Sequence, residues 1–129
     1  MSQLHKTILE ADLHETKGAS TASTGQYLTA DGVGGSVWAT KFVKFTSSLS
    51  PAIVAANTTA EQTFTITGLV LSTDIIVTVS KPTAQAGLGI VGWRVSADNT
   101  LAITFSNNTG AGITPTAAQT YSVLAYRGT

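Results

Sequence analysis

Apolar and polar residues alternate with a period of two along most of the chain after Pro51. Such runs occupy residues 63–67, 75–80, 91–96, 100–106 and 121–126, and each places its larger side chains on one side of a pleated strand. A shorter run begins at Phe42 and ends before Ser50-Pro51. Six or seven short strands separated by polar loops predict an all-β fold, an antiparallel β-sandwich or jelly-roll-like module. The expected core residues are Ile53, Phe64, Ile66, Leu69, Ile75, Val77, Val79, Trp93, Val95, Leu101, Ile103, Phe105, Tyr121 and Val123.

The connections between these runs have recognisable turn chemistry. Ala97-Asp98-Asn99 predicts a hairpin, because Asp and Asn tolerate left-handed backbone. The glycines of Gly87-Leu88-Gly89-Ile90-Val91-Gly92 are spaced as in a dinucleotide-binding loop, but that loop must lead from a strand into a helix. Here the segment leads into a strand pattern. The glycines therefore predict a bulge or the close approach of another backbone.

The residues before this region have a different pattern. Apolar residues between Leu4 and Leu13 partly follow one helical face, which favours a helix or turn too short to be stable alone. Residues 14–37 are rich in Gly, Ser, Thr and Ala, with turn signals at Asp31-Gly32 and Gly34-Gly35. We expect this stretch to be extended or looped and to be ordered by the surface it lies against. The sequence thus predicts an extended N-terminal anchoring arm over residues 1–45 and a β-sandwich domain over residues 50–129.

Composition narrows the range of partners. The 129 residues carry a net charge of zero and only 11% are charged, against roughly 25% in a typical soluble domain. Lys41 and Lys44 are the only close basic pair, so electrostatic binding of nucleic acid is not expected. An almost uncharged β surface favours coverage by identical copies or by a larger lattice. The alternative is a monomer with a Thr-rich face.

Cysteine is absent, which excludes disulfides and thiolate metal sites. Neither an apolar leader nor an apolar stretch of membrane-spanning length is present, so we expect a soluble protein made in a cytosol, without a membrane partner. Asn57-Thr58-Thr59 and Asn107-Asn108-Thr109 match the glycosylation pattern, which means little without a leader.

Residues with catalytic or metal-binding chemistry are few. A metal site would combine His5, Asp12, His14 and Glu15, but a Gly/Ser-rich arm does not hold ligands in fixed geometry. We interpret both histidines as solvated or interface residues and expect neither metal nor cofactor. The β module contains no His for a Ser-His-Asp arrangement. Its carboxylates are Glu61, Asp74 and Asp98, which are interpreted as turn and strand-end residues rather than a glycosidase pair. The chain is therefore not expected to be an enzyme.

Aromatic residues offer a binding alternative. Trp93, Tyr121 and Tyr126 are candidates for a sugar-stacking platform, although core packing explains Trp93 more simply. Tyr126 and Arg127, near the C-terminal end, are the better candidates for an exposed contact.

Two sets of segments resemble structural proteins of tailed bacteriophages. His14-Glu15-Thr16-Lys17-Gly18-Ala19, followed by Gly25-Gln26-Tyr27-Leu28-Thr29-Ala30-Asp31-Gly32 and Trp38, resembles the opening of phage head-fibre and related virion proteins, "HE-x-KG … G-x-x-x-x-ADG … W". Residues 57–66, 79–90 and 100–105 are similar to a β module found in many phage virion proteins. Together these segments touch most of the chain.

The resemblance implies a non-enzymatic virion protein, a capsid-surface decoration protein or short head-fibre subunit made in the bacterial host cytoplasm. Such proteins are often homotrimers that bind the major capsid protein through a terminal segment and project a β domain. The long shaft of a true fibre is lacking here. The alternative is a tail-fibre or baseplate module that recognises a host surface glycan. Carried onto this sequence, the anchoring residues are His14, Glu15, Lys17, Gly18, Gly25, Tyr27, Asp31, Gly32 and Trp38.

Overall fold

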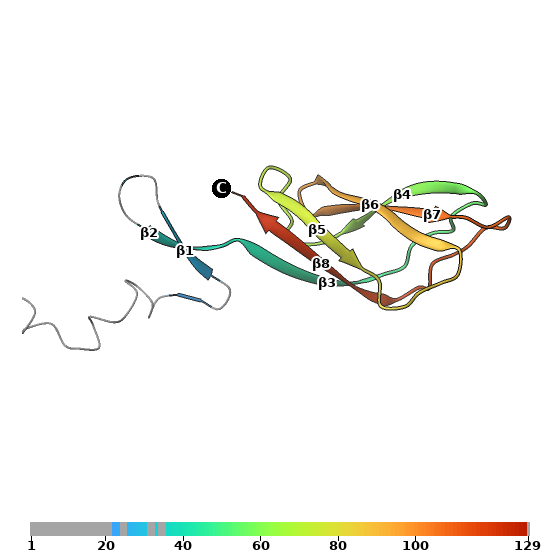
Figure 1. The fold of residues 1–129 in the computed structure, drawn as a ribbon, viewed down its shortest axis with the longest axis horizontal. Coiled ribbons are helices and arrows are strands. Elements are labelled where there is room, and N and C mark those ends of the chain that lie inside the picture. The colour runs from blue at the N-terminus through green and yellow to red at the C-terminus, as the bar shows by residue number, and fades with distance from the viewer. Residues whose placement is uncertain (1–21, 24–25, 31–32, 34–35, 129) are drawn as a thin grey trace, which may run out of the picture. The chain divides into compact units, whose positions relative to one another are not determined.

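The computed structural model describes residues 22–23, 26–30, 33 and 36–128, and this part of the chain consists of strands and loops (Figure 1). The chain divides into two units, Met1–Thr40 and Lys41–Thr129, and each is described by itself.

The N-terminal unit contains one antiparallel hairpin. Strand β1 (Gln26–Ala30) pairs with β2 (Ser36–Thr40), so that Leu28 lies opposite Trp38. The residues of the two predicted turn signals, Asp31-Gly32 and Gly34-Gly35, lie outside the described residues. The strands are extended, as expected for the arm, but their pairing is a feature that the Gly/Ser-rich pattern did not reveal. The helix or turn predicted before Leu13 lies outside the described residues.

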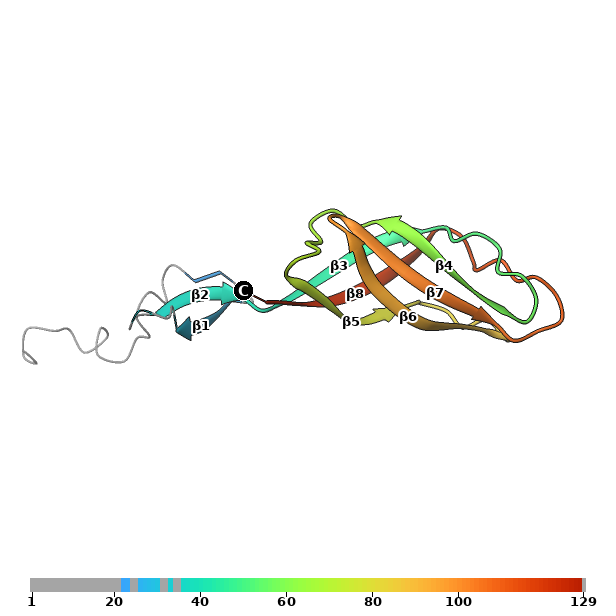
Figure 2. The same ribbon diagram turned by 90° about the horizontal axis from the view of Figure 1, so that it is seen from above.

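The second unit is a β-sandwich of two three-stranded antiparallel sheets (Figures 1 and 2). The first sheet has the order β3 (Phe42–Leu49), β8 (Gln119–Arg127), β5 (Asp74–Ser80). The second has the order β4 (Thr58–Thr65), β7 (Thr100–Asn107), β6 (Leu88–Ala97). This architecture confirms the predicted all-β antiparallel sandwich. Its first strand, β3, lies entirely before residue 50, and residues 42–45 of this strand belong to the segment that the sequence pattern assigned to the arm.

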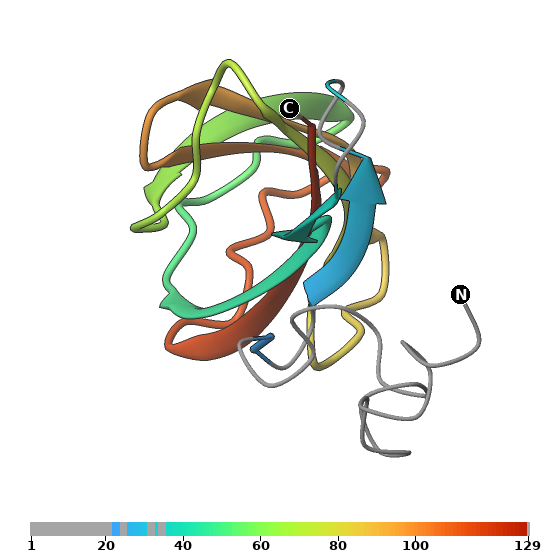
Figure 3. The ribbon, with the colours of Figure 1, turned by 90° about the vertical axis from the view of Figure 1, so that its left-hand side faces the viewer.

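The core lies between the two sheets, which Figure 3 shows end-on. The central strands β7 and β8 supply its most buried side chains, because each has a neighbouring strand on both sides. Nine of the expected core residues are buried: Ile66, Leu69, Val79, Val95, Leu101, Ile103, Phe105, Tyr121 and Val123. Phe64 is partly buried against them. Buried residues that the pattern missed are Leu49, Val54, Ile76, Ala102 and Ala125.

Four expected core residues are exposed instead. Ile75 and Val77 point away from the core because the pairing of β5 with β8 shifts between Ile76 and Thr78. This irregularity changes the phase of the alternation, so the buried residues of β5 include Ile76 and Val79. The other two exceptions are Ile53 and Trp93.

Ile53 is exposed because its neighbour Val54 takes the buried position. Val54 forms an antiparallel bridge with Ile113, with hydrogen bonds in both directions of 2.8 and 3.0 Å. Trp93 is 36% exposed at the rim between the sheets. Ile53 lies outside the named strands, so the period-two rule does not apply to it. Trp93 lies within β6 opposite the buried Ile103, and it is partly exposed because β6 is an edge strand with register shifts on both sides of this position.

The hairpin predicted at Ala97-Asp98-Asn99 is confirmed. Asn99 has a φ of 59° in the hairpin between β6 and β7, and its side chain accepts a 2.7 Å hydrogen bond from the Gly68 amide. Gly87 has a φ of 77°, and a Cβ there would lie 2.2 Å from the Thr109 methyl group. The group that approaches Gly87 is thus the Thr109 side chain and not another backbone, as the sequence had suggested. The predicted bulge is confirmed, because the register of β6 against β7 shifts between Ile90 and Gly92.

Candidate docking surfaces

The hairpin of the N-terminal unit contains two of the predicted anchoring residues, Tyr27 and Trp38. Tyr27 lies opposite Ala39, and Trp38 lies opposite Leu28. Residues directly opposite each other share a face, so Tyr27 and Trp38 lie on opposite faces of the hairpin. The remaining predicted anchoring residues, His14, Glu15, Lys17, Gly18, Gly25, Asp31 and Gly32, lie outside the described residues.

Both faces of this hairpin expose apolar side chains. Tyr27 is 53% exposed on one face and Leu28 is 41% exposed on the other. The indole Nε1 of Trp38 is buried and has no hydrogen-bond acceptor in the part of the chain that the structure describes. A two-stranded hairpin is marginally stable by itself in water. The hairpin thus has the features of a segment that another surface completes.

At the other end of the sequence, the Arg127 side chain is 33% exposed but is bound to Asp74, so it is not a free contact. Its Nε donates to Asp74 Oδ1 at 2.7 Å and one terminal nitrogen donates to Asp74 Oδ2 at 2.7 Å. The same terminal nitrogen donates to the Gly68 carbonyl at 2.8 Å. Of the two residues predicted as an exposed contact, Tyr126 is the one whose hydroxyl makes no such hydrogen bonds to the described residues.

Asp74 is the buried partner in this pair. Its carboxylate also accepts hydrogen bonds from the Val70 amide at 3.0 Å and from the Thr73 hydroxyl at 3.3 Å. The hydrogen bonds from Arg127, aided by these donors and by the guanidinium charge, hold the pKa of Asp74 below its ordinary value against the opposing effect of burial. The carboxylate therefore stays ionised and ties the C-terminal strand to the loop before β5.

The other two carboxylates of the sandwich also have structural contacts. Glu61 on β4 forms a bidentate ion pair with Arg94 on β6, across the intervening strand β7. The Arg94 Nε donates to Glu61 Oε2 at 3.0 Å, and one terminal nitrogen donates to Glu61 Oε1 at 2.7 Å. Asp98 accepts a 2.8 Å hydrogen bond from the Leu71 amide. Within the described ranges, no group of three His, Cys, Asp or Glu residues could hold a metal ion. His5 and His14, considered above as ligands, lie outside these ranges.

The three-aromatic sugar platform does not form. Tyr121 is fully buried in the core. Trp93 is fixed at the rim by a 3.1 Å hydrogen bond from its Nε1 to the Ile76 carbonyl, which links β6 to β5 across the two sheets. Trp93 and Tyr126 remain partly exposed, so two of the three aromatic residues face solvent.

A row of apolar side chains crosses the outer face of the first sheet. Phe42, Tyr126 and Ile75 are direct neighbours in register on β3, β8 and β5. Their rings and side chains face outward, because the next residues on β8 and β5, Ala125 and Ile76, are buried. The Phe42 and Tyr126 rings meet edge to face, with centroids 5.6 Å apart.

This row continues to the flank of the sandwich. Val77 is exposed next to the irregularity in β5, and Val91 and Trp93 are exposed on β6, which the Trp93–Ile76 hydrogen bond places against β5. We call these residues the apolar patch: Phe42, Ile75, Val77, Val91, Trp93 and Tyr126. The sequence carried one signal for it, since Ile75-Ile76-Val77 is a run of three apolar residues that a half-buried strand cannot place on one face.

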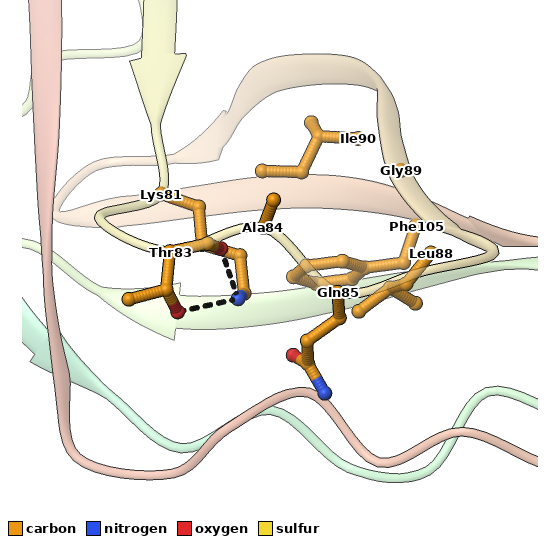
Figure 4. Close-up of a pocket in the computed structure, with 8 residues that line it drawn as sticks. All are labelled: Lys81, Thr83, Ala84, Gln85, Leu88, Gly89, Ile90 and Phe105. Atoms are coloured by element: carbon orange, nitrogen blue, oxygen red, sulfur yellow. Dashed lines mark hydrogen bonds between the residues drawn. The ribbon is translucent and has the colours of Figure 1, made fainter.

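A small cavity lies beside strand β6 (Figure 4). Its volume is about 230 Å³, and its lining residues are Lys81, Thr83, Ala84, Gln85, Leu88, Gly89, Ile90 and Phe105. The Lys81 ammonium donates to the Thr83 carbonyl at 2.5 Å and to the Thr83 hydroxyl at 3.3 Å, as Figure 4 shows. Burial lowers the pKa of Lys81. The cavity is smaller than the ~300–1,000 Å³ of typical ligand pockets, and its cation is already bonded within its own loop.

Two further findings concern the sequence patterns. Asn107, the asparagine of the second glycosylation match, is buried. Its side-chain amide donates to the Val54 and Ala111 carbonyls and accepts from the Thr109 hydroxyl, so this side chain has a structural role. Among the described residues no helix is long and apolar enough to cross a membrane.

No family model, curated protein or solved structure matches the chain. The functional conclusion therefore rests on the sequence motifs and on the geometry of the two units.

Proposed function

We propose that the protein is a structural component of a phage virion, a capsid-surface decoration protein or short head-fibre subunit. Its N-terminal unit docks on the major capsid protein, and its sandwich projects from the shell as part of a homotrimer. The motif from His14 to Trp38 supports the virion assignment through the resemblance described above.

The observation that carries this proposal is the hairpin of β1 and β2. It exposes apolar side chains on both faces and contains a buried indole nitrogen without an acceptor in the described residues. A separate sandwich with its own core follows from Lys41. This division gives one part of the chain a core and leaves the other part with apolar surface to cover, as docking requires.

Attachment through three copies of the arm explains how such a short segment binds the capsid stably. Ordering an arm in a groove costs conformational entropy, so one copy binds weakly. Three arms joined through their sandwiches raise the effective concentration of the second and third, which increases overall attachment by about 10²–10⁴-fold. Because the net charge is zero, long-range electrostatic attraction contributes little to this attachment.

Deletion of residues 1–40 tests the anchor. The truncated protein retains every strand of the sandwich and should keep its β-type circular dichroism spectrum, yet fail to co-sediment with capsids of the phage that encodes it. Retained co-sedimentation would place the anchor in the sandwich and overturn the proposal.

A matched pair of full-length variants makes the test sharper. Leu28→Lys changes an exposed leucine of the hairpin, and Leu71→Lys changes an exposed leucine of the sandwich. We expect Leu28→Lys to reduce capsid binding at least tenfold and Leu71→Lys to leave it unchanged. Equal effects of the two substitutions would count against a hairpin-specific anchor.

The second candidate function is recognition of a host surface glycan by a tail-fibre or baseplate module. The partial exposure of Trp93 and Tyr126 favours it, because aromatic faces stack on sugars. A glycan array on the purified protein separates the two functions, as does immunogold labelling of virions. Labelling over the whole head supports decoration, and labelling confined to the tail supports receptor binding.

A further inference from the structure

We propose that the apolar patch is the surface through which copies of this chain contact one another. The number of copies, three, rests on the proposed function, whereas the location of the contact rests on the sandwich itself. The occupant of the patch is thus a neighbouring copy of the same chain.

The size of the patch is the first argument. If a fully exposed aromatic side chain presents about 150–250 Å², the exposed fractions of the six side chains amount to roughly 500 Å² of apolar surface. The largest apolar patch of a typical monomer measures about 300–600 Å² and is often functional. A stable interface buries about 800 Å² per partner, so the patch supplies more than half of one side.

The distribution of charge is the second argument. Around the axis of a ring, equivalent residues of the three copies approach one another, so a charge placed there faces its own copies and costs free energy. Strands β3, β8 and β5 contain only three charged residues, Lys44, Asp74 and Arg127. Asp74 and Arg127 neutralise each other, so Lys44 at the margin is the one charge of these strands without an ion pair among the described residues. A patch of this kind suits a second copy of itself better than a charged partner.

The edge of the sheet indicates that side chains rather than backbone make this contact. Strand β5 is an edge strand, which could pair with another strand through its free backbone groups. Its irregularity after Ile76 disturbs that ladder, and the Ile76 carbonyl already accepts the Trp93 indole. Both features disfavour edge-to-edge pairing, so the exposed side chains remain as the contact surface.

The position of the patch fits a ring of three. It crosses the outer face of one sheet in a row from Phe42 on β3 to Ile75 on β5. It then continues onto the flank where β5 lies beside β6 (Figures 1 and 2). One copy therefore offers two adjoining apolar surfaces. In a closed ring each subunit contacts two neighbours through different surfaces, as this arrangement allows.

Analytical ultracentrifugation of the full-length chain tests the inference. The wild type should sediment with three times the 13.3 kDa mass of one chain. Ile75→Lys should sediment as a monomer, because three buried ammonium groups would face one apolar junction. The matched control is Ile53→Lys, since Ile53 and Ile75 are 62% and 67% exposed in the same sandwich. This control should remain trimeric.

A second substitution protects the test against a folding defect. Val77→Lys also lies in the patch and should give a monomer whose circular dichroism spectrum matches that of Ile53→Lys. This monomer should still unfold in one cooperative transition, at a lower temperature than the trimeric control, because contacts between copies no longer stabilise it. Folded trimers of both Ile75→Lys and Val77→Lys would overturn the location of the interface. A wild-type dimer would overturn the threefold arrangement.

The outcomes separate this inference from the proposed function. A trimer that dissociates on Ile75→Lys but never binds capsids supports the inference and contradicts the function. A wild-type monomer at all concentrations overturns the inference, and capsid co-sedimentation then decides the function on its own.

Discussion

At the scale of single residues, the pair formed by Asp74 and Arg127 holds the C-terminal strand in place. The two residues are separated by 53 positions, and their bonds reach the loop between Gly68 and Asp74. The sequence predicted Asp74 at the start of a strand and Arg127 as an exposed contact. It could not predict their pairing, because the register of β5 against β8 depends on an irregularity that the alternation does not show.

Removing the guanidinium should destabilise the fold. Arg127→Ala leaves the Asp74 carboxylate buried without its cation, so we expect a loss of about 2–3 kcal/mol in the free energy of unfolding. Urea denaturation measures this loss. Arg94→Ala is the control, because it breaks the exposed pair with Glu61 and should cost much less. Equal losses would contradict the structural role of Asp74.

The same pair predicts a dependence of stability on pH. The pKa of Asp74 is lower in the folded protein than the ordinary value of about 3.9, so the folded state favours the ionised form. Its contribution to stability is complete above that ordinary value and is lost as the pH falls through the folded pKa. The difference in urea midpoint between wild type and Asp74→Asn should therefore shrink below about pH 4. A constant difference down to pH 2 would contradict this.

At the scale of elements, the sequence predicted the strands well and their partners poorly. Alternation located most strands of the sandwich and the Asp98-Asn99 turn, since both depend on neighbouring residues. It did not show that β1 pairs with β2, because residues 14–37 lack the regular alternation of apolar and polar residues by which strands are recognised. It also placed β3 near the arm, whereas β3 pairs with β8 near the opposite end of the sequence.

The entry into strand β6 depends on Gly87. Ala at this position would require a φ of 77° and would place its Cβ 2.2 Å from the Thr109 methyl group. We expect Gly87→Ala to lower the free energy of unfolding by about 2–4 kcal/mol. Gly110→Ala is the matched control, since nothing lies within 4 Å of a Cβ there, and it should change stability by less than about 0.5 kcal/mol.

Thr109→Ser supplies the rescue. It removes the methyl group and keeps the hydroxyl that bonds to Asn107 and Ala111. The double variant should recover part of the stability that Gly87→Ala loses, as thermal denaturation would show. If no stability returns, the clash with Thr109 is not the cause.

At the scale of the whole molecule, the chain combines a sandwich that buries its own core with a hairpin that does not. The sequence indicated this division through the change from Gly/Ser-rich to alternating segments. The apolar patch, by contrast, was hidden, because Ile75, Val77 and Trp93 were expected inside the core. Its residues come from three strands of one sheet and one of the other, so only the folded structure brings them together.

The central claim is that the hairpin of β1 and β2 attaches the sandwich to a phage capsid. Electron cryomicroscopy of capsids saturated with the full-length protein tests it most directly. We predict density for residues 26–40 against the major capsid protein, with sandwiches grouped in threes farther from the shell. Sandwiches seated directly on the shell, with the hairpin away from it, would contradict the claim.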